Sequence, residues 1–169
     1  MTKSGITRRI DELGRIVIPK EIRINLGIRE GEPLEIYVEN NSIIIKKFSQ
    51  VENIKDISNK ICNIISDVCK IDLMITDREK IIVTSSKLKT LTNKSLTKEM
   101  KALIDNREAY ISEKIDNFID LNKYFIMIPI ITSTDCSGLI IIVSEEKNKE
   151  NLVYAKIASK LIIDSLDVT

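Results

Sequence analysis

Residues 5–27, near the start of the chain, place turn, strand and helix signals in an order that few folds can satisfy. Gly14 allows a tight turn because glycine has no side chain to strain there. Residues 15–18 form a short β-branched run typical of a strand. Pro19 ends that strand and suits the first turn of a helix. The order predicts a strand, a turn, a second strand and a short helix.

The same pattern fixes the neighbouring elements. A strand at residues 6–10 is expected before the turn, and the helix is expected at residues 20–26. Ile22 and Leu26 lie four positions apart, on what should be the buried side of the helix. Gly27 should close the helix in a left-handed conformation.

A hairpin should follow this helix. Residues 34–39 alternate apolar and polar side chains, which predicts a half-buried strand. Asn40 and Asn41 suit a two-residue turn because asparagine tolerates positive φ, and residues 42–48 return as the partner strand. The resulting unit of fewer than 50 residues is too small to bury its own apolar side chains. We therefore expect it to dimerise.

The rest of the 169-residue chain predicts a second, α+β domain. Its first element should be a polar joint at residues 49–53. The further expected elements are a helix at 54–70, a hairpin of 71–75 with 80–84, a polar loop at 87–93, a helix starting at 95–99, a short strand at 109–112 followed by loop, two central strands at 124–131 and 138–143, and a helix at 151–166. The expected domains are residues 1–50 and 54–169.

Composition argues against an enzyme. The chain has no histidine, which removes the usual general base and the commonest zinc ligand. Cys62, Cys69 and Cys136 lack metal-ligand spacing, so we expect them to pack as small apolar residues rather than to sense redox state. No phosphate-binding loop is visible, and we expect no cofactor, no metal and no catalytic residue. No apolar run approaches the ~20 residues of a membrane span and no signal peptide opens the chain, so we expect a cytoplasmic protein.

Basic residues suggest a nucleic-acid partner only through their spacing. The net charge is +1, and residues 1–48 hold nine basic and seven acidic residues. Within this segment, arginines recur at the ends of the expected elements: Arg8, Arg9, Arg15 and Arg23. Arginine forks suit phosphate oxygens and guanine edges. The alternative is solvated pairing with Asp11, Glu12 and Glu21, although such surface pairs contribute only ~0–1 kcal/mol. Spacing alone leaves both interpretations open.

A family resemblance adds to this interpretation. The run from Arg8 to Arg23, Arg-Arg-Ile-Asp-Glu-Leu-Gly-Arg-Ile-Val-Ile-Pro-Lys-Glu-Ile-Arg, resembles the AbrB family of bacterial transition-state regulators. Glu30-Gly31, Leu34-Glu35-Ile36-Tyr37 and Ile45-Lys46-Lys47 continue the resemblance over about the first 48 residues. In that family two chains interlace their hairpins into one swapped β-barrel, and arginines of both chains grip double-stranded DNA. The resemblance implies DNA contacts by Arg8, Arg15 and Arg23, supported by Arg9 and Lys20. Ile24 stands where relatives often carry a second basic residue, so one contact of the family is expected to be missing.

The long second domain resembles the sporulation regulators of that family, whose carboxy-terminal half is similar to a GAF domain, a small-molecule sensor fold. This resemblance implies a nucleoid-associated activator and repressor of sporulation genes. It also implies an unidentified ligand and a homotetramer assembled through the helices at 54–70 and 151–166. Ile61 and Ile65 are expected to contribute to that assembly. Asp135, Cys136 and Ser137 are candidates to line a ligand site, but a plain turn between strands is the favoured explanation.

Two other classes of function compete with this one. An antitoxin of the MazE type uses the same kind of amino-terminal barrel, but would carry a polar, disordered tail. The helix and strand periodicity that continues to residue 166 counts against such a tail. An enzyme in the second domain has no supporting residue pattern.

Overall fold

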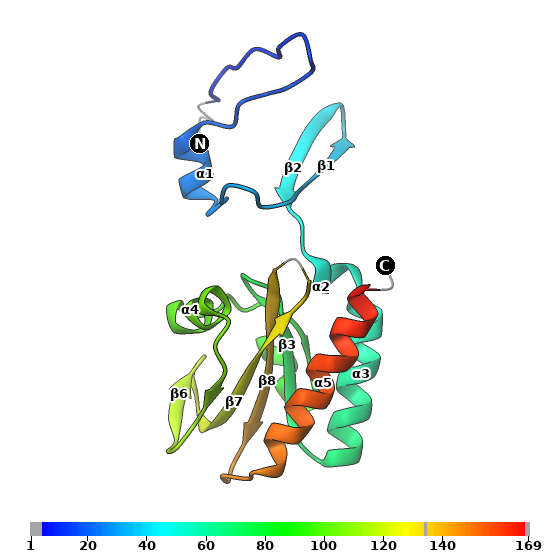
Figure 1. Ribbon diagram of the computed structural model, residues 1–169, viewed down its shortest axis with the longest axis vertical. Coiled ribbons are helices and arrows are strands. Elements are labelled where there is room, and N and C mark those ends of the chain that lie inside the picture. The colour runs from blue at the N-terminus through cyan, green and yellow to red at the C-terminus, as the bar shows by residue number, and fades with distance from the viewer. Residues whose placement is uncertain (1–4, 134, 168–169) are drawn as a thin grey trace. The chain divides into compact units, whose positions relative to one another are not determined.

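The computed structural model describes residues 5–133 and 135–167, which fall into two compact units (Figure 1). Unit 1 is Met1–Phe48 and unit 2 is Ser49–Thr169. Ser4, before the expected first strand, and Thr134, between the strands expected at 124–131 and 138–143, lie outside the described residues. Both units mix helices and strands, which confirms the expected α+β class.

In unit 1 the hairpin forms as predicted. Strand β1 (Leu34–Glu39) pairs antiparallel with β2 (Ser42–Lys47), and Val38 lies opposite Ile43. Asn40 and Asn41 both adopt positive φ, 47° and 61°, as a two-residue turn between twisted strands requires.

Helix α1 (Lys20–Asn25) also confirms its prediction. Pro19 precedes it, and Gly27 ends it at φ 61°. The Gly27 amide donates to the Ile24 carbonyl at 3.1 Å, and the Ile28 amide donates to the Arg23 carbonyl at 2.7 Å. This is the Schellman arrangement that glycine favours.

The strands expected at residues 6–10 and 15–18 are absent from the single chain, so that prediction is wrong for it. The turn between them does form, since the Gly14 amide donates to the Asp11 carbonyl at 3.0 Å. A strand needs a neighbour to bond its backbone, and neither segment has one among the described residues. Leu26 is 57% exposed, so its expected burial on α1 is also wrong in one chain.

Unit 1 has almost no interior. Among residues 5–48 only Pro19 is buried. Large apolar side chains of the hairpin and of the preceding segments remain open to solvent: Ile6, Ile10, Leu13, Ile16, Val17, Ile24, Leu26, Ile36, Tyr37, Val38, Ile43 and Phe48.

Unit 2 is built on an antiparallel sheet with strand order β4-β3-β8-β7-β5, with β6 added on β7. Its strands are β3 (Asp72–Thr76), β4 (Ile81–Thr84), β5 (Tyr110–Ile111), β6 (Asp116–Phe118), β7 (Leu121–Ile131) and β8 (Cys136–Ser144). Its helices are α2 (Gln50–Asn53), α3 (Lys55–Cys69), the 3₁₀ helix η1 (Ser86–Leu91), α4 (Lys98–Asn106) and α5 (Glu150–Asp167).

Helices cover both faces of this sheet, and each face carries its own core. Alternate residues of β8 point to opposite sides, so Ile140 joins one apolar cluster and Ile141 the other. Helices α3 and α5 lie side by side over the first face (Figure 1). Helices η1 and α4 cover the second, where Met100 and Ile104 pack on the sheet.

Three expectations for unit 2 need correction. The polar joint at 49–53 is instead helix α2, whose Val51 is fully buried. The polar loop at 87–93 contains η1, because Leu88 and Leu91 turn into the second core. The loop after residue 112 contains β6, which pairs with the extended start of β7. In each case a few apolar contacts outweigh the polar composition.

The cysteines pack as expected. Cys62 and Cys136 are buried, and Cys69 is half-buried against the first core. Burial raises the pKa of the Cys62 thiol to about 12, because a thiolate would lose its hydration there.

Candidate nucleic-acid interface

Asp11 organises the turn that presents Arg15. Its Oδ1 accepts from the amides of Leu13 and Arg15 at 3.0 and 2.8 Å, and its Oδ2 accepts from Arg15 Nε at 2.7 Å. The Arg15 backbone amide, followed by its side chain, holds the pKa of Asp11 below its ordinary value. Asp11 therefore stays ionised and anchors the base of the Arg15 side chain.

The Arg15 guanidinium remains accessible despite this ion pair. Its side chain is 72% exposed. Guanidinium carries five N–H donors, and only Nε is bound within the described part of the chain. The remaining edge can address an external acceptor such as a phosphate oxygen.

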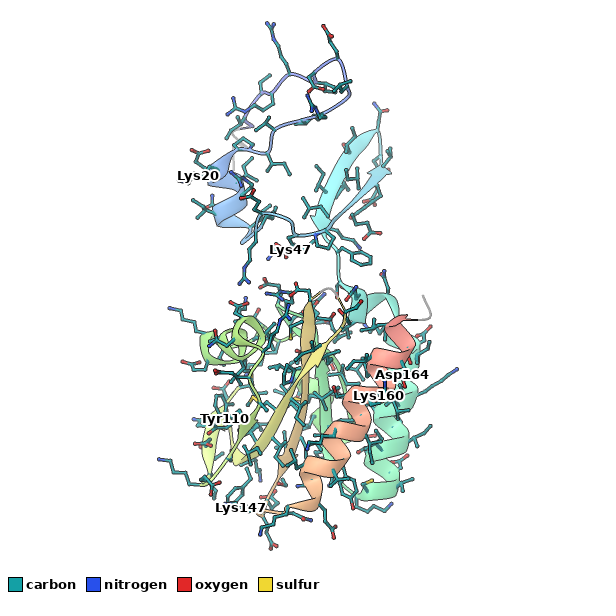
Figure 2. The ribbon with its side chains drawn as sticks, in the orientation of Figure 1. Lys20, Lys47, Tyr110, Lys147, Lys160 and Asp164 are labelled. Carbon is teal, nitrogen blue, oxygen red and sulfur yellow. The ribbon has the colours of Figure 1, made fainter. Side chains whose placement is uncertain are left out.

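The other four predicted site residues lie around the same segment. Arg8 and Arg9 are exposed and precede the turn. Lys20 is exposed at the first residue of α1 (Figure 2), and Arg23, half-buried, lies three positions later on the same helix. Among residues 5–133 and 135–167, none of the four has an ion-pair partner. The expected pairing of arginines with acids therefore occurs at Asp11 alone; in the described residues Glu12 and Glu21 hold none of them.

The lysines of the hairpin, unlike these four residues, have acidic partners within unit 1. Lys46 Nζ lies 3.0 Å from Glu35 Oε2 and 5.5 Å from the centre of the Tyr37 ring. Lys47 Nζ lies 3.8 Å from Glu32 Oε1. Hairpin lysines are thus neutralised locally, whereas the cations of residues 8–23, Arg15 excepted, are not. Ile24, beside Arg23, is 66% exposed.

In unit 2, Asp135, Cys136 and Ser137 are occupied by intramolecular contacts. Arg78 Nη1 donates to Asp135 Oδ2 at 3.2 Å and to the Cys136 carbonyl at 2.7 Å. The Ser137 hydroxyl donates to Gln50 Oε1. Burial raises the pKa of the Cys136 thiol. These bonds favour the structural interpretation of the segment over a ligand site.

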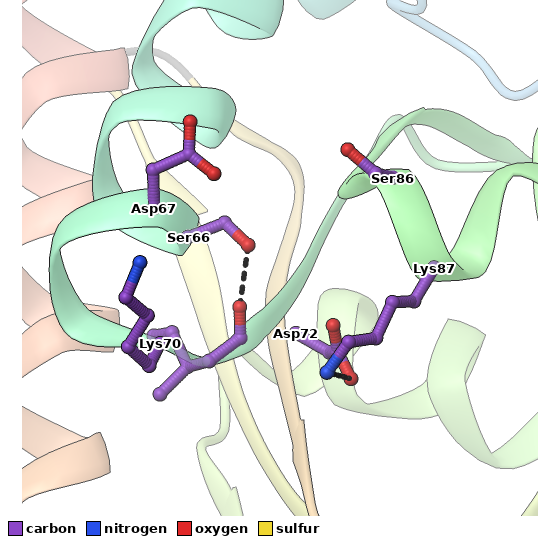
Figure 3. Close-up of a pocket in the computed structure, with 7 residues that line it drawn as sticks. Ser66, Asp67, Lys70, Asp72, Ser86 and Lys87 are labelled. Atoms are coloured by element: carbon purple, nitrogen blue, oxygen red, sulfur yellow. Dashed lines mark hydrogen bonds and ion pairs between the residues drawn. The ribbon is translucent and has the colours of Figure 1, made fainter.

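A shallow depression of about 170 Å³ lies between the end of α3 and the start of η1 (Figure 3). Its lining residues are Ser66, Asp67, Lys70, Ile71, Asp72, Ser86 and Lys87. Ser66 Oγ donates to the Ile71 carbonyl at 2.5 Å, and Lys87 Nζ lies 3.9 Å from Asp72 Oδ2. Its charges are mixed and its volume is below the ~300–1,000 Å³ of ordinary ligand pockets. We assign it no ligand.

Residues 5–133 and 135–167 contain no group of three or more His, Cys, Asp or Glu side chains that could hold a metal ion. No helix in that part of the chain has the length and apolar character needed to cross a membrane.

Comparison with known proteins bears on both units. The family described as antidote-toxin recognition MazE, bacterial antitoxin, matches residues 7–52. The family described as stage V sporulation protein T C-terminal, transcription factor, matches residues 53–163. Stage V sporulation protein T of Bacillus subtilis (strain 168) is 36% identical over 156 residues, which cover 87% of each chain. The chain belongs to the stage V sporulation protein T family.

Unit 1 is also similar to the transition state regulatory protein AbrB of Bacillus subtilis, at 56% identity over 48 residues covering 28% of this chain and 50% of AbrB. The solved amino-terminal DNA recognition domain of AbrB is 55% identical, covers 29% of this chain and 92% of that domain, and gives a TM-score of 0.25. This likeness therefore rests on sequence identity rather than on superposition.

The GAF domain of an Acinetobacter phosphoenolpyruvate-protein phosphotransferase is similar in structure, with a TM-score of 0.53 over 72% of this chain and 84% of that domain. At 11% identity it shows the fold alone. The carboxy-terminal part of this stage V sporulation protein T family member therefore has a GAF-like fold.

Proposed function

We propose that this protein is a sporulation transcription regulator that binds double-stranded DNA as a swapped-hairpin dimer. Residues 1–50 serve as the DNA-binding domain, and residues 54–169 serve as the GAF-like domain for assembly and sensing. The observation that carries the proposal is the set of locally unneutralised cations around an ordered turn. This set lies in a segment 55% identical to a domain known for DNA recognition.

Two features of unit 1 support a dimer: exposed apolar side chains on the hairpin, and extended segments whose backbone has no neighbouring strand in the described part of the chain. Ile36, Val38 and Ile43 share one face of the hairpin and are 66%, 75% and 62% exposed. Residues 6–10 and 15–18 are β-branched but lack strand neighbours in the described chain. A second copy would cover that face and supply strand partners, forming one barrel from two chains.

In such a dimer every cation of the site occurs twice. We assign Arg8 mainly to phosphate contacts, and Arg15 and Arg23 to both phosphates and base edges. Arg9 and Lys20 support them as further positive charges. A cytoplasmic, nucleoid-associated location follows from this role.

Tetramer assembly is proposed through the outer faces of α3 and α5. Ile57, Ile64 and Val68 are exposed on α3, as are Val153, Ile157 and Leu161 on α5. Ile65 belongs to the core of unit 2 and Ile61 packs partly against it, which corrects their expected role as assembly contacts. Ile64 and Val68 are the positions to change: polar residues there should convert tetramer to dimer in sedimentation experiments.

Sensing of an unidentified small molecule by unit 2 is proposed from its GAF-like fold. A thermal-shift screen of residues 49–169 against metabolite mixtures tests it, since a ligand that binds the folded state raises the melting temperature.

The antitoxin alternative is weaker. The MazE match ends at residue 52. Beyond it the chain forms a folded unit with two apolar cores, where an antitoxin would carry a tail that folds on its toxin.

The deciding experiment is a titration of duplex DNA at several salt concentrations with the wild-type protein and Arg8→Ala, Arg15→Ala and Arg23→Ala variants. Loss of a phosphate contact should weaken all sequences alike and reduce the salt slope by about 1. Loss of a base contact should cost about 1–3 kcal/mol at one operator position. Ile24→Arg should tighten binding and steepen the slope if that position faces DNA.

Lys147→Ala is the matched control. Lys147 lies in unit 2 beside Glu113 (Figure 2), so its loss changes net charge equally without touching the site. Circular dichroism confirms folding in each case. Wild-type affinity in all three arginine variants would show that the DNA-binding surface is elsewhere.

A further inference from the structure

The turn between β3 and β4, residues 77–80, contacts three other parts of unit 2. Asp77 is 7% exposed and orders the turn, because its Oδ1 accepts from the amides of Glu79 and Lys80, both at 2.7 Å. The Asp77 amide donates to the Lys80 carbonyl at 3.0 Å. A buried carboxylate with these bonds holds a fixed geometry.

On one side this turn holds helix α2. Ser49 Oγ donates to Asp77 Oδ2 at 3.1 Å and accepts from the Glu52 amide at 3.2 Å, so one hydroxyl both caps α2 and ties it to the turn. Lys80 Nζ lies 3.3 Å from Glu52 Oε1. The fully buried Val51 adds an apolar anchor.

On the other side the turn holds α4 and the segment that leads into β8. Arg78 is the shared group: Nη2 donates to Asp105 Oδ1 of α4 at 2.8 Å, and Nη1 donates to the Cys136 carbonyl of β8 at 2.7 Å. Glu79 pairs with Lys101, also on α4.

Close backbone packing fixes the turn against β8. A Cβ at Gly138 would lie 1.9 Å from the Thr76 carbonyl oxygen, a distance that no side chain can occupy. Thr76 Oγ1 accepts from the Leu139 amide at 3.0 Å and donates to the Asp77 carbonyl at 2.7 Å. Displacement of β8 or α4 therefore moves residues that adjoin Asp77 in the turn.

Helix α2 begins where unit 1 ends. Strand β2 ends at Lys47 and the α2 cap is Ser49, so Phe48 alone separates them along the chain. A joint this short gives α2 influence over the strand that precedes it, whatever the arrangement of the units.

We propose that the β3–β4 turn is a coupling element that passes changes at α4 and the start of β8 to α2, and so to the DNA-binding unit. The two ends of the coupling are the Arg78–Asp105–Cys136 contacts and the Ser49–Asp77 bond. The inference rests on the proposed function for its effect on DNA, but its effect on α2 is independent of DNA.

The test uses the full-length protein with Arg78→Gln, which removes the guanidinium contacts to Asp105 of α4 and to the Cys136 carbonyl of β8 without touching α2. Asp105→Asn is a milder second variant, which removes the carboxylate charge that faces Arg78 and keeps the shape of the side chain. Lys123→Gln is the matched control: it loses an ion pair to Glu145, and its side chain is 31% exposed against 23% for Arg78. Circular dichroism and melting establish that each variant is folded.

Two quantities are measured: hydrogen exchange of the Glu52 and Asn53 amides, and affinity for duplex DNA. Both Arg78→Gln and Asp105→Asn should speed exchange and weaken DNA binding by about fivefold, with no change for Lys123→Gln. A looser joint has more conformational freedom to lose on binding, which sets the direction.

Unchanged exchange at α2 in both folded variants overturns the inference, as does unchanged DNA affinity when the wild-type protein binds. If the wild-type protein binds no duplex, the proposed function fails instead, and exchange alone then decides whether the turn couples α4 to α2.

Discussion

Units 1 and 2 use the same aliphatic residue types to opposite effect. In unit 2 a sheet carries apolar side chains into two separate cores, and Phe125, Leu73 and Ile140 are completely buried. In unit 1 side chains of the same kind, such as Ile36 and Val38, remain exposed, and the one buried residue described is a proline.

The difference arises from topology rather than from composition. Unit 2 has enough strands and helices to cover both faces of its sheet, and burial of apolar surface contributes roughly 25 cal/mol per Å². A two-stranded hairpin and a six-residue helix have no second layer to offer. Unit 1 therefore has no core of its own in the described part of the single chain, whereas unit 2 has two.

The largest difference between the units should appear when each is produced as a separate fragment and its folding is measured. A fragment of residues 1–52 should pass from folded dimer to unfolded chain on dilution, because dimer formation and folding are one equilibrium. Residues 49–169 should stay folded at every concentration. Sedimentation with circular dichroism measures both, and a folded monomer of residues 1–52 would remove the contrast between the units.

The second-largest effect should come from replacing a glycine of unit 2, with a glycine of unit 1 as the control. Gly138→Ala should destabilise unit 2 by about 3 kcal/mol or more, because the new Cβ meets the Thr76 carbonyl at 1.9 Å. Gly5→Ala has no atom within 4 Å and serves as the control. Thermal melting of the two variants measures the difference, and equal melting temperatures would mean that β8 can shift away from β3.

Two valines give a smaller and more selective contrast. Val51 is fully buried and Val38 is 75% exposed. Val51→Ala should lower the free energy of unfolding of unit 2 by about 2 kcal/mol. Val38→Ala should leave that value unchanged and weaken only dimerisation. Urea unfolding of residues 49–169, beside sedimentation of the full chain, separates these effects, and a loss of unit 2 stability in Val38→Ala would contradict the division.

The smallest effect concerns Asp11. Its pKa is lowered from 3.8, chiefly by the Arg15 amide and then by the Arg15 side chain. A depressed pKa stabilises the folded turn above pH 3.8, and that contribution is lost as pH falls through the folded-state value. Arg15→Ala should raise the Asp11 pKa only part of the way, because the amide bond survives. Carboxyl NMR titration checks this, and full return to 3.8 would assign the shift to the side chain alone.

Much of this architecture was predictable because local signals and tertiary structure agree. The two asparagines at 40–41, the apolar stripe of α3 and the long runs of β7 and β8 each carry a strong periodic or turn signal. The elements missed were α2, η1 and β6, which contain four, six and three residues. In such short elements one or two buried side chains decide the structure, and no period can reveal them.

The candidate site shows the same division. Residue type and place led to a prediction of which arginines contact DNA, and that stays a prediction; they did not indicate that Asp11 would organise the turn and pair with Arg15. Nor did it indicate the contacts of Arg78, because they join residues separated by 27 and 58 positions. Strands 6–10 and 15–18 were predicted from β propensity, which is realised only when a neighbouring strand is present.

The position of β8 in the sheet has a consequence for how the chain is made. Strand β3 pairs with β8, so Ile75 must wait for Ile140, which the ribosome adds 65 residues later. Until then the β3 edge of the β3–β4 hairpin is open, and the hairpin has an apolar surface on each side. Unit 2 is therefore completed only once β8 and then α5 have emerged. Unit 1 precedes unit 2 along the chain, so in the proposed dimer it has that interval in which to meet a second copy.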